Sequence, residues 1–179
     1  MEIWASIFCR IIVMRFAIIA ACDYLSGGIG IAGKLPWYIK ADMDYFRSAT
    51  SGGTVIMGRL TWESIGSTPL PNRHNIIVSS AFPYSPSLDA ALALADDTTN
   101  VFVIGGRRLF KEALAHPDCD TAYLTFIRPS VVMTYDAFFP LDSLNKNGWT
   151  IDHMTEWKEE DDFKYMFTKY FKTSQDLKT

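Results

Sequence analysis

Two continuous runs of apolar residues, at positions 16–21 and 101–104, constrain the fold of this chain most strongly. A strand buried on both faces reads as such a run because both faces need apolar side chains, and strands of this kind occur in parallel sheets covered by helices. Along the rest of the chain, strand-like segments alternate with segments of helical spacing. The sequence therefore predicts a single α/β domain with a mostly parallel central sheet and helices on both faces.

Periodicity and turn residues predict where the other elements lie. Helices are expected at residues 39–50, in a short turn begun by Thr61, at residues 87–95 with Ser87 as the cap, and at residues 107–114. Strands are expected at residues 54–57, 75–80 and 121–127, followed by a loop at residues 128–140. The last two strands, at residues 150–156 and 163–172, are joined by an acidic turn at residues 159–162. They should form an antiparallel hairpin at the edge of the sheet.

Length, charge and cysteine content narrow the class of protein. A chain of 179 residues can bury a core without disulfides or metal, and we expect one domain at residues 14–173, followed by a tail at residues 174–179. The net charge of −3 argues against a general nucleic-acid binder, which would normally present a basic surface. The 3 cysteines form no CxxC motif, which argues against a disulfide framework or a zinc site. A reducing compartment, the cytoplasm, is the simplest prediction.

The N-terminal 22 residues are largely apolar, and residues 19–22 look like the cleavage site of a lipoprotein signal. Arg10 and Arg15 interrupt the apolar run, however, and Glu2 stands where a signal peptide would carry basic residues. The same charges argue against a membrane-spanning helix. We interpret residues 16–21 as a central strand, Met14 as a natural start and residues 1–13 as an extension; export remains the alternative.

An acidic residue breaks the apolar pattern of the first predicted helix. Ile39, Met43 and Phe46 recur at helical spacing, and Asp42 lies three residues after Ile39 and four before Phe46, on the same side. A carboxylate on a buried face is costly unless it is paired, hydrogen-bonded or used in catalysis. The simpler alternative is that Asp42 caps the helix. A glycine-rich loop at residues 27–33 precedes it, which favours a mobile cover over a pocket with one polar group at its floor.

Small and polar residues follow several of the predicted strands. Gly105 and Gly106 separate a strand from a helix, which is an arrangement that can bring backbone amides close to a phosphate. Arg59 follows another strand and offers a forked donor, and Ser79 and Ser80 end a third. A Gly-Gly pair is more often only a tight turn, but ligands in α/β sheets gather at the carboxyl ends of strands. These groups together predict a dinucleotide site.

Several segments resemble, in order, the dihydrofolate reductase family. They are GGIGIAGKLPW at residues 27–37, VIMGRLTWESI at 55–65, PLPNR at 69–73, NIIVSS at 75–80 and VIGG at 103–106. The resemblance extends over about residues 16–172. It implies NADPH-dependent reduction of 7,8-dihydrofolate to 5,6,7,8-tetrahydrofolate in support of thymidylate and one-carbon metabolism, binding of antifolates such as methotrexate, and a monomer with no metal, nucleic-acid or membrane partner.

The same resemblance implies roles for particular residues. Asp42 would hydrogen-bond the pterin and support protonation of its ring nitrogen, Thr125 would brace Asp42, and Trp37 would help to hold a water. The residues implied to contact the folate are Ile19, Phe46, Arg47, Ile65, Leu70, Arg73 and Ile104. Those implied to contact NADPH are Ala21, Gly28, Ile29, Gly30, Ile31, Ala32, Gly33, Lys34, Leu35, Arg59, Leu60, Thr61, Ser79, Ser80, Gly105, Gly106, Arg107, Arg108, Leu109 and Phe110.

The chain departs from the family pattern at three places, which lie at the implied adenosine, phosphate and nicotinamide sites respectively. Residues 82–86 form a shorter segment than in many relatives, Arg107 stands where a small residue is frequent, and Phe110 stands where Tyr is common. Two other functions remain open: a related pterin or pyrimidine reductase, and a non-catalytic binding or structural relative. Asp42, Trp37 and Arg73 together favour folate over a substrate without a glutamate tail.

Overall fold

The computed structural model describes residues 15–81, 83–96, 98–146 and 148–173. The predictions about the extension at residues 1–13, the start at Met14 and the tail at residues 174–179 lie outside the described residues, as does Phe82 in the predicted short segment. In the described part of the chain, no helix is long and apolar enough to cross a membrane.

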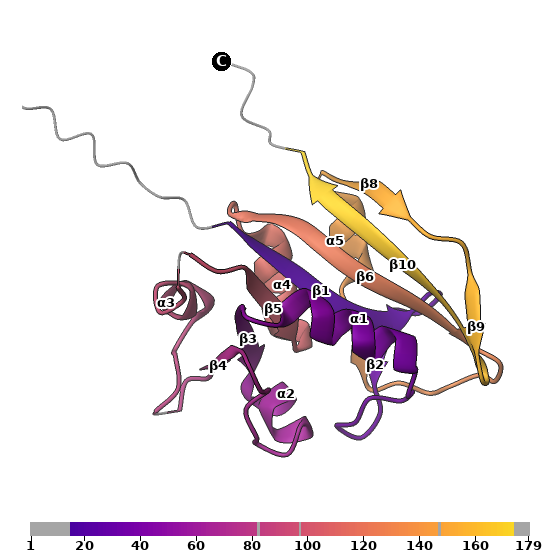
Figure 1. Cartoon of the computed structure of the whole chain (residues 1–179), viewed down its shortest axis with the longest axis horizontal. Coiled ribbons are helices and arrows are strands. Elements are labelled where there is room, and N and C mark those ends of the chain that lie inside the picture. The colour runs from indigo at the N-terminus through magenta and orange to yellow at the C-terminus, as the bar shows by residue number, and fades with distance from the viewer. Residues whose placement is uncertain (1–14, 82, 97, 147, 174–179) are drawn as a thin grey trace, which may run out of the picture.

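An eight-stranded sheet forms the centre of the molecule (Figure 1). Its order is β4 (His74–Val78), β3 (Thr54–Gly58), β5 (Val101–Gly105), β1 (Phe16–Asp23), β6 (Cys119–Pro129), β10 (Phe163–Lys172) and β8 (Trp149–Met154), with β9 (Lys158–Glu160) also paired to β10. The pairings from β4 to β6 are parallel, whereas β10 is antiparallel to β6, β8 and β9. The predicted parallel sheet with an antiparallel C-terminal edge is confirmed.

A second, two-stranded sheet joins segments that were predicted to be loops. β2 (Gly28–Gly30) pairs antiparallel with β7 (Ala137–Phe138). The acidic turn is also shorter than predicted, because Glu159 and Glu160 belong to β9 and only Asp161 and Asp162 form the turn. Strands of two or three residues are too short to show a periodic pattern, so pairing with a distant segment is what defines them.

Five helices flank the sheet: α1 (Lys40–Thr50), α2 (Arg59–Ser64), α3 (Leu88–Leu92), α4 (Arg107–Ala115) and α5 (Leu141–Lys146). In Figure 1, α1 crosses in front of the sheet, whereas α4 and α5 lie behind it. The Ser87 cap is confirmed, since its hydroxyl accepts a hydrogen bond from the Ala90 amide at 3.1 Å. α3 ends three residues earlier than predicted, α2 begins at Arg59 instead of Thr61, and α5 was not predicted.

The two faces of the sheet bury different sets of side chains. On the α4 face, Ile18, Leu124 and Phe126 belong to the larger core cluster, together with residues of α4. On the α1 face, a smaller cluster of Trp37, Ile39, Ile127 and Tyr165 packs near the start of α1. Successive side chains in a strand alternate between faces. Thr125, two residues before Ile127 in β6, therefore lies on the same face of the sheet as α1.

Candidate functional site

Asp42 lies in the first turn of α1 and is only 5% exposed. Burial raises the pKa of its carboxyl to about 6 because the charged form is poorly solvated there, and the negative charge of Glu160 acts in the same direction. A side-chain hydrogen bond with Thr125 acts against this rise. Asp42 is thus a buried acid that exchanges its proton close to neutral pH, which is the range useful to a general acid.

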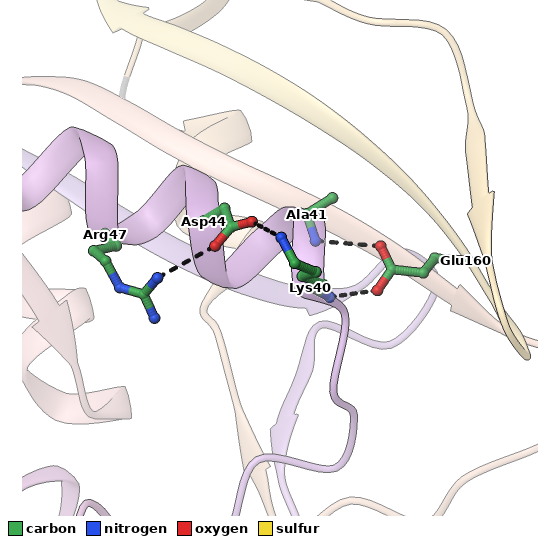
Figure 2. Close-up of polar contacts among 5 residues, drawn as sticks. All are labelled: Lys40, Ala41, Asp44, Arg47 and Glu160. Atoms are coloured by element: carbon green, nitrogen blue, oxygen red, sulfur yellow. Dashed lines mark hydrogen bonds and ion pairs between the residues drawn. The ribbon is translucent and has the colours of Figure 1, made fainter.

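The alternative that Asp42 caps α1 is wrong. The N-cap residue is Ile39, which offers no side-chain cap. Instead, the carboxylate of Glu160 accepts hydrogen bonds from the backbone amides of Lys40 and Ala41, the latter at 3.2 Å (Figure 2). Glu160 is a residue of the site region that sequence reasoning missed. Its acidic surroundings indicated a turn, and no local pattern connects β9 with a helix some 120 residues earlier.

Thr125 and Trp37, the two residues predicted to support Asp42, are both buried. Thr125 is 2% exposed and lies in the middle of β6, where it is paired with Ala21 of β1 on one side and Phe167 of β10 on the other. Trp37 is 5% exposed, and its indole Nε1 finds no hydrogen-bond acceptor within the described ranges. A buried donor of this kind is commonly satisfied by an ordered water. This geometry suits the predicted role of Trp37.

The glycine loop is anchored at its base by the β2–β7 pairing. The aromatic ring of Tyr135 lies so close to Gly28 that a Cβ there would be 2.2 Å from it, and the Tyr135 hydroxyl donates to Asp23 at 3.2 Å. The Ala32 amide donates to the Asp136 carboxylate at 2.6 Å. Beyond these anchors, the residues at positions 32–35 are exposed. The loop therefore has a fixed base and a solvent-facing tip.

The residues predicted to contact the folate lie on α1, on neighbouring strands and in the segment before β4. Ile19 of β1 is buried, whereas Phe46, Ile65, Leu70 and Ile104 are half-buried. Side chains that are neither buried nor fully exposed are available to a ligand at the surface of the core. The assignment of these side chains to the folate remains a prediction.

Arg73 and Arg47 form a positively charged region beside α1. The Arg73 guanidinium lies over the Phe46 ring, 5.7 Å from its centroid, and donates to Thr50 Oγ1 and to the Pro71 carbonyl, both at 3.0 Å. Partial burial and, to a smaller extent, the charge of Arg47 lower the pKa of Arg73. An anion bound between the two guanidinium groups would reduce the repulsion between their positive charges.

The carboxyl ends of three parallel strands meet at one edge of the sheet. Met57 of β3 is in register with Gly105, and Gly58 is in register with Val78 of β4. A Cβ on Gly105 would lie 2.8 Å from Thr61 Oγ1, and one on Gly58 would lie 3.6 Å from the Gly106 nitrogen. Glycine is therefore needed at Gly105, which has a φ of 148°, whereas 3.6 Å at Gly58 is an ordinary contact distance. The predicted phosphate-binding segments are brought together.

Two of the side chains predicted to contact NADPH form ion pairs within the protein, and two others are buried in the core. Arg59 is paired with Glu63 one helical turn later, and Arg108 is paired with Glu112 at 3.1 Å. The side chains of Leu109 and Phe110 are 4% and 2% exposed and pack in the core beneath α4. Arg107, Leu60 and Ser80 are exposed, whereas Thr61 and Ser79 are half-buried. Leu109 and Phe110 are about as buried as Asp42 and Ile19, and their contact with the cofactor remains a prediction.

Neither a metal site nor a reactive thiol is evident in the described residues. No group of three or more His, Cys, Asp or Glu side chains among them could hold a metal ion. Cys22 and Cys119 are free and buried, and burial raises the pKa of both thiols, that of Cys119 to about 12. Thiols with such values stay protonated and unreactive at neutral pH. Asp42 remains the titratable group best suited to chemistry on this face.

Comparisons with known proteins agree on one family. A sequence profile for the family described as Dihydrofolate reductase matches residues 15–172. The chain is 41% identical over 143 residues to dihydrofolate reductase type 3 of Salmonella typhimurium, covering 76% of this chain and 83% of that protein. It is 36% identical over 151 residues to a bifunctional dihydrofolate reductase-thymidylate synthase of Paramecium tetraurelia, covering 79% of this chain but 31% of that longer protein.

A solved structure gives the same result in three dimensions. The dihydrofolate reductase of Enterococcus faecalis, in complex with NADP(H) and RAB-propyl, superposes with a TM-score of 0.75 at 32% sequence identity. The match covers 88% of this chain and 95% of that one.

Proposed function

This chain belongs to the dihydrofolate reductase family, which catalyses NADPH-dependent reduction of 7,8-dihydrofolate to 5,6,7,8-tetrahydrofolate, and we propose that Asp42 is the acid of this reaction. The observation that carries the proposal is the buried carboxyl of Asp42, whose pKa is raised to about 6. Reduction of a C=N bond needs one hydride and one proton, and NADPH supplies the hydride when bound. The protein must therefore align the substrate and manage a single proton.

Asp42 is suited to both tasks. Its carboxylate can accept hydrogen bonds from the amino group and ring nitrogen of a pterin, which fixes the orientation of the ring on the α1 face. Its raised pKa keeps part of the population protonated near neutral pH, so the acid favours protonation of the ring nitrogen beside the reacting carbon. Thr125 restricts the carboxyl by its hydrogen bond, and the Trp37 indole can hold a water that passes the proton.

The positive region formed by Arg73 and Arg47 fits the other end of the substrate. The glutamate tail of dihydrofolate carries carboxylates, and a planar guanidinium binds a carboxylate with two parallel hydrogen bonds. Arg73 is held in place by Thr50 and Pro71, which reduces the entropy lost when it binds. Phe46, beneath the guanidinium, the buried Ile19 and the half-buried Ile65, Leu70 and Ile104 supply apolar surface for the pterin and the aminobenzoyl group.

The strand ends on the other side of the site suit a dinucleotide. The Cβ-free surface at Gly58, Gly105 and Gly106 lets backbone amides approach a phosphate, and α4 begins directly after Gly106 with no side-chain cap. Thr61, Ser79 and Ser80 add hydroxyls at the same edge. We assign Ala21 and residues 28–35 to the nicotinamide. We assign Arg59 to the phosphate on the adenosine ribose, which requires it to exchange Glu63 for the ligand.

We also infer a catalytic domain at residues 14–173 that acts as a monomer in the cytoplasm. The family match over residues 15–172 supports these bounds. The buried free thiols of Cys22 and Cys119 suit a reducing compartment. Light scattering of the purified chain tests the monomer, and location in cells is tested by fractionation. The E. faecalis structure was solved with an additional ligand besides NADP(H), and we expect antifolates such as methotrexate to bind here too.

The test is NADPH oxidation by the purified chain, followed as loss of NADPH absorbance after addition of dihydrofolate. Asp42→Asn is the matched control because it keeps the size of the side chain and removes the ionisable group. We expect oxidation that depends on dihydrofolate, is blocked by methotrexate and is strongly reduced in Asp42→Asn. A folded wild-type chain that oxidised no NADPH would support a non-catalytic relative. Activity only on pterins without a glutamate tail would support a related reductase.

A further inference from the structure

Glu160 reaches across from the C-terminal hairpin to the first turn of α1 (Figure 2). Its two carboxylate oxygens accept hydrogen bonds from the Lys40 and Ala41 amides, directly before Asp42. The first amides of a helix have no partners within the helix and carry partial positive charge, so a carboxylate is well placed there. No other residue of β9 contacts α1 through a hydrogen bond within the described part of the chain.

We propose that Glu160 is a positioning residue for Asp42, holding the first turn of α1 to the sheet and placing a fixed negative charge beside the acid. This role deepens the proposed reductase mechanism and rests on it. Glu160 is not a catalytic residue, because it acts through the helix backbone and through its charge.

The sheet connects Glu160 rigidly with the other support of Asp42. Glu160 is paired with Phe163 of β10, and four residues further along β10, Phe167 is paired with Thr125 of β6. Thr125 hydrogen-bonds the Asp42 side chain, whereas Glu160 holds the backbone two residues and one residue before it. The turn that carries Asp42 is therefore fixed at two points that belong to one continuous sheet. These two contacts restrict both the position and the orientation of the Asp42 carboxyl.

The charges around Asp42 explain why Glu160 should affect its proton. On α1, Lys40 is committed to Asp44, which Arg47 also approaches at 3.3 Å (Figure 2). Cys22 of β1, whose side chain belongs to the cluster on the other face of the sheet, and Tyr45 of α1 also interact with the charge of Asp42, but burial raises the pKa of both, so they are neutral at neutral pH. Tyr165 of β10, near Glu160, likewise has a raised pKa. Glu160 is thus the charged neighbour from another element that acts on Asp42, and its charge favours the protonated acid.

The experiment compares Glu160→Gln and Glu160→Ala with the neighbouring Glu159→Gln in the full chain. Glu159 is also in β9, but its carboxylate pairs with Lys164 at 2.6 Å and makes no hydrogen bond or ion pair with α1 among the described residues. The Gln side chain of Glu160→Gln keeps one oxygen that can accept a hydrogen bond from an α1 amide. This variant should therefore stay folded even if Glu160→Ala does not. The first measurement is titration of the Asp42 carboxyl by ¹³C NMR with labelled aspartate, assigned with Asp42→Asn. It needs neither substrate nor cofactor.

We expect both Glu160 variants to lower the titration midpoint of Asp42 by roughly half a pH unit, the order that one charge produces at a partly solvated site. Glu159→Gln should leave it unchanged. In the reductase assay at pH 8, kcat of Glu160→Gln should then fall about threefold, while KM for dihydrofolate stays the same, because Glu160 does not touch the substrate. Glu160→Ala should also lower the melting temperature, since it leaves both amides without their acceptor.

An unchanged Asp42 midpoint in folded Glu160→Gln would overturn the proposal, as would an equal displacement in Glu159→Gln. A wild-type chain without reductase activity but with the expected displacement would refute the proposed function and leave the role of Glu160 intact. The two proposals therefore fail separately.

Discussion

Asp42→Asn should abolish most of the activity and, at neutral pH, stabilise the protein. Both effects come from the same buried carboxyl, which is 5% exposed and has its pKa raised to about 6. An amide has nearly the same shape and can still hydrogen-bond Thr125, but it carries no charge at any pH. The substitution therefore separates the chemistry of the acid from the cost of burying it.

The size of the stability effect follows from the pKa. The folded chain raises the pKa from the ordinary value of 3.8 to about 6, which corresponds to about 3 kcal/mol at about 1.36 kcal/mol per pKa unit. Because the folded state holds the proton more tightly, the favourable contribution is complete below pH 3.8 and is lost as the pH rises through 6. At pH 8 the wild type bears the full cost of a buried carboxylate, whereas the Asn variant does not.

Urea unfolding of both proteins between pH 4.5 and 8 measures this difference. Other titrating groups cancel between the variants, so the free-energy gap should widen by about 2 kcal/mol across that range in favour of Asp42→Asn. At the size of this domain, that gap corresponds to roughly 4 to 8 °C in melting temperature. A gap that stays constant from pH 4.5 to 8 would show that the carboxyl is not held in its protonated form, and the reasoning from burial would be refuted.

The activity should change in the opposite direction. Above pH 6 the protonated fraction of wild-type Asp42 falls about tenfold per pH unit, so the rate of the chemical step should decline with the same slope. Asp42→Asn should be slower by about 10²- to 10⁴-fold at pH 6 and should show no such decline. NADPH affinity, measured by fluorescence titration, should be unchanged. A decline of equal slope in the variant would assign the titration to another group.

Three further substitutions test other parts of the site. Arg73→Lys should weaken dihydrofolate binding about tenfold to a hundredfold, because forked hydrogen bonds to a carboxylate are lost, while tail-less pterins are unaffected; equal losses in titrations of both would move Arg73 out of the tail site. Arg59→Ala should reduce NADPH affinity by a similar factor with little effect on NADH, and an equal loss for NADH in the same titration would reassign it to the pyrophosphate. Gly28→Ala would place a Cβ 2.2 Å from the Tyr135 ring, so the free energy of unfolding should fall by about 1–3 kcal/mol. Adding Tyr135→Ala should recover part of that loss, and the absence of any recovery would mean that the strain lies in the backbone.

Local sequence pattern determined those parts of the protein in which neighbours along the chain supply the signal. The apolar runs that became β1 and β5 need no partner to be recognised, since burial on both faces requires apolar side chains at every position. The Ser87 cap and the place of Asp42 on α1 depend on residues within one helical turn. Gly105 and Gly106 marked a strand end because backbone without Cβ atoms permits close approach.

Tertiary structure decided the features that depend on contacts between distant segments. β2, which begins at Gly28, forms only because β7 pairs with it through Phe138. Glu160 caps α1 only because the sheet places β9 beside that helix. Short strands and single side-chain contacts leave no periodic trace in the sequence, since their free energy comes from partners that only the folded chain brings together.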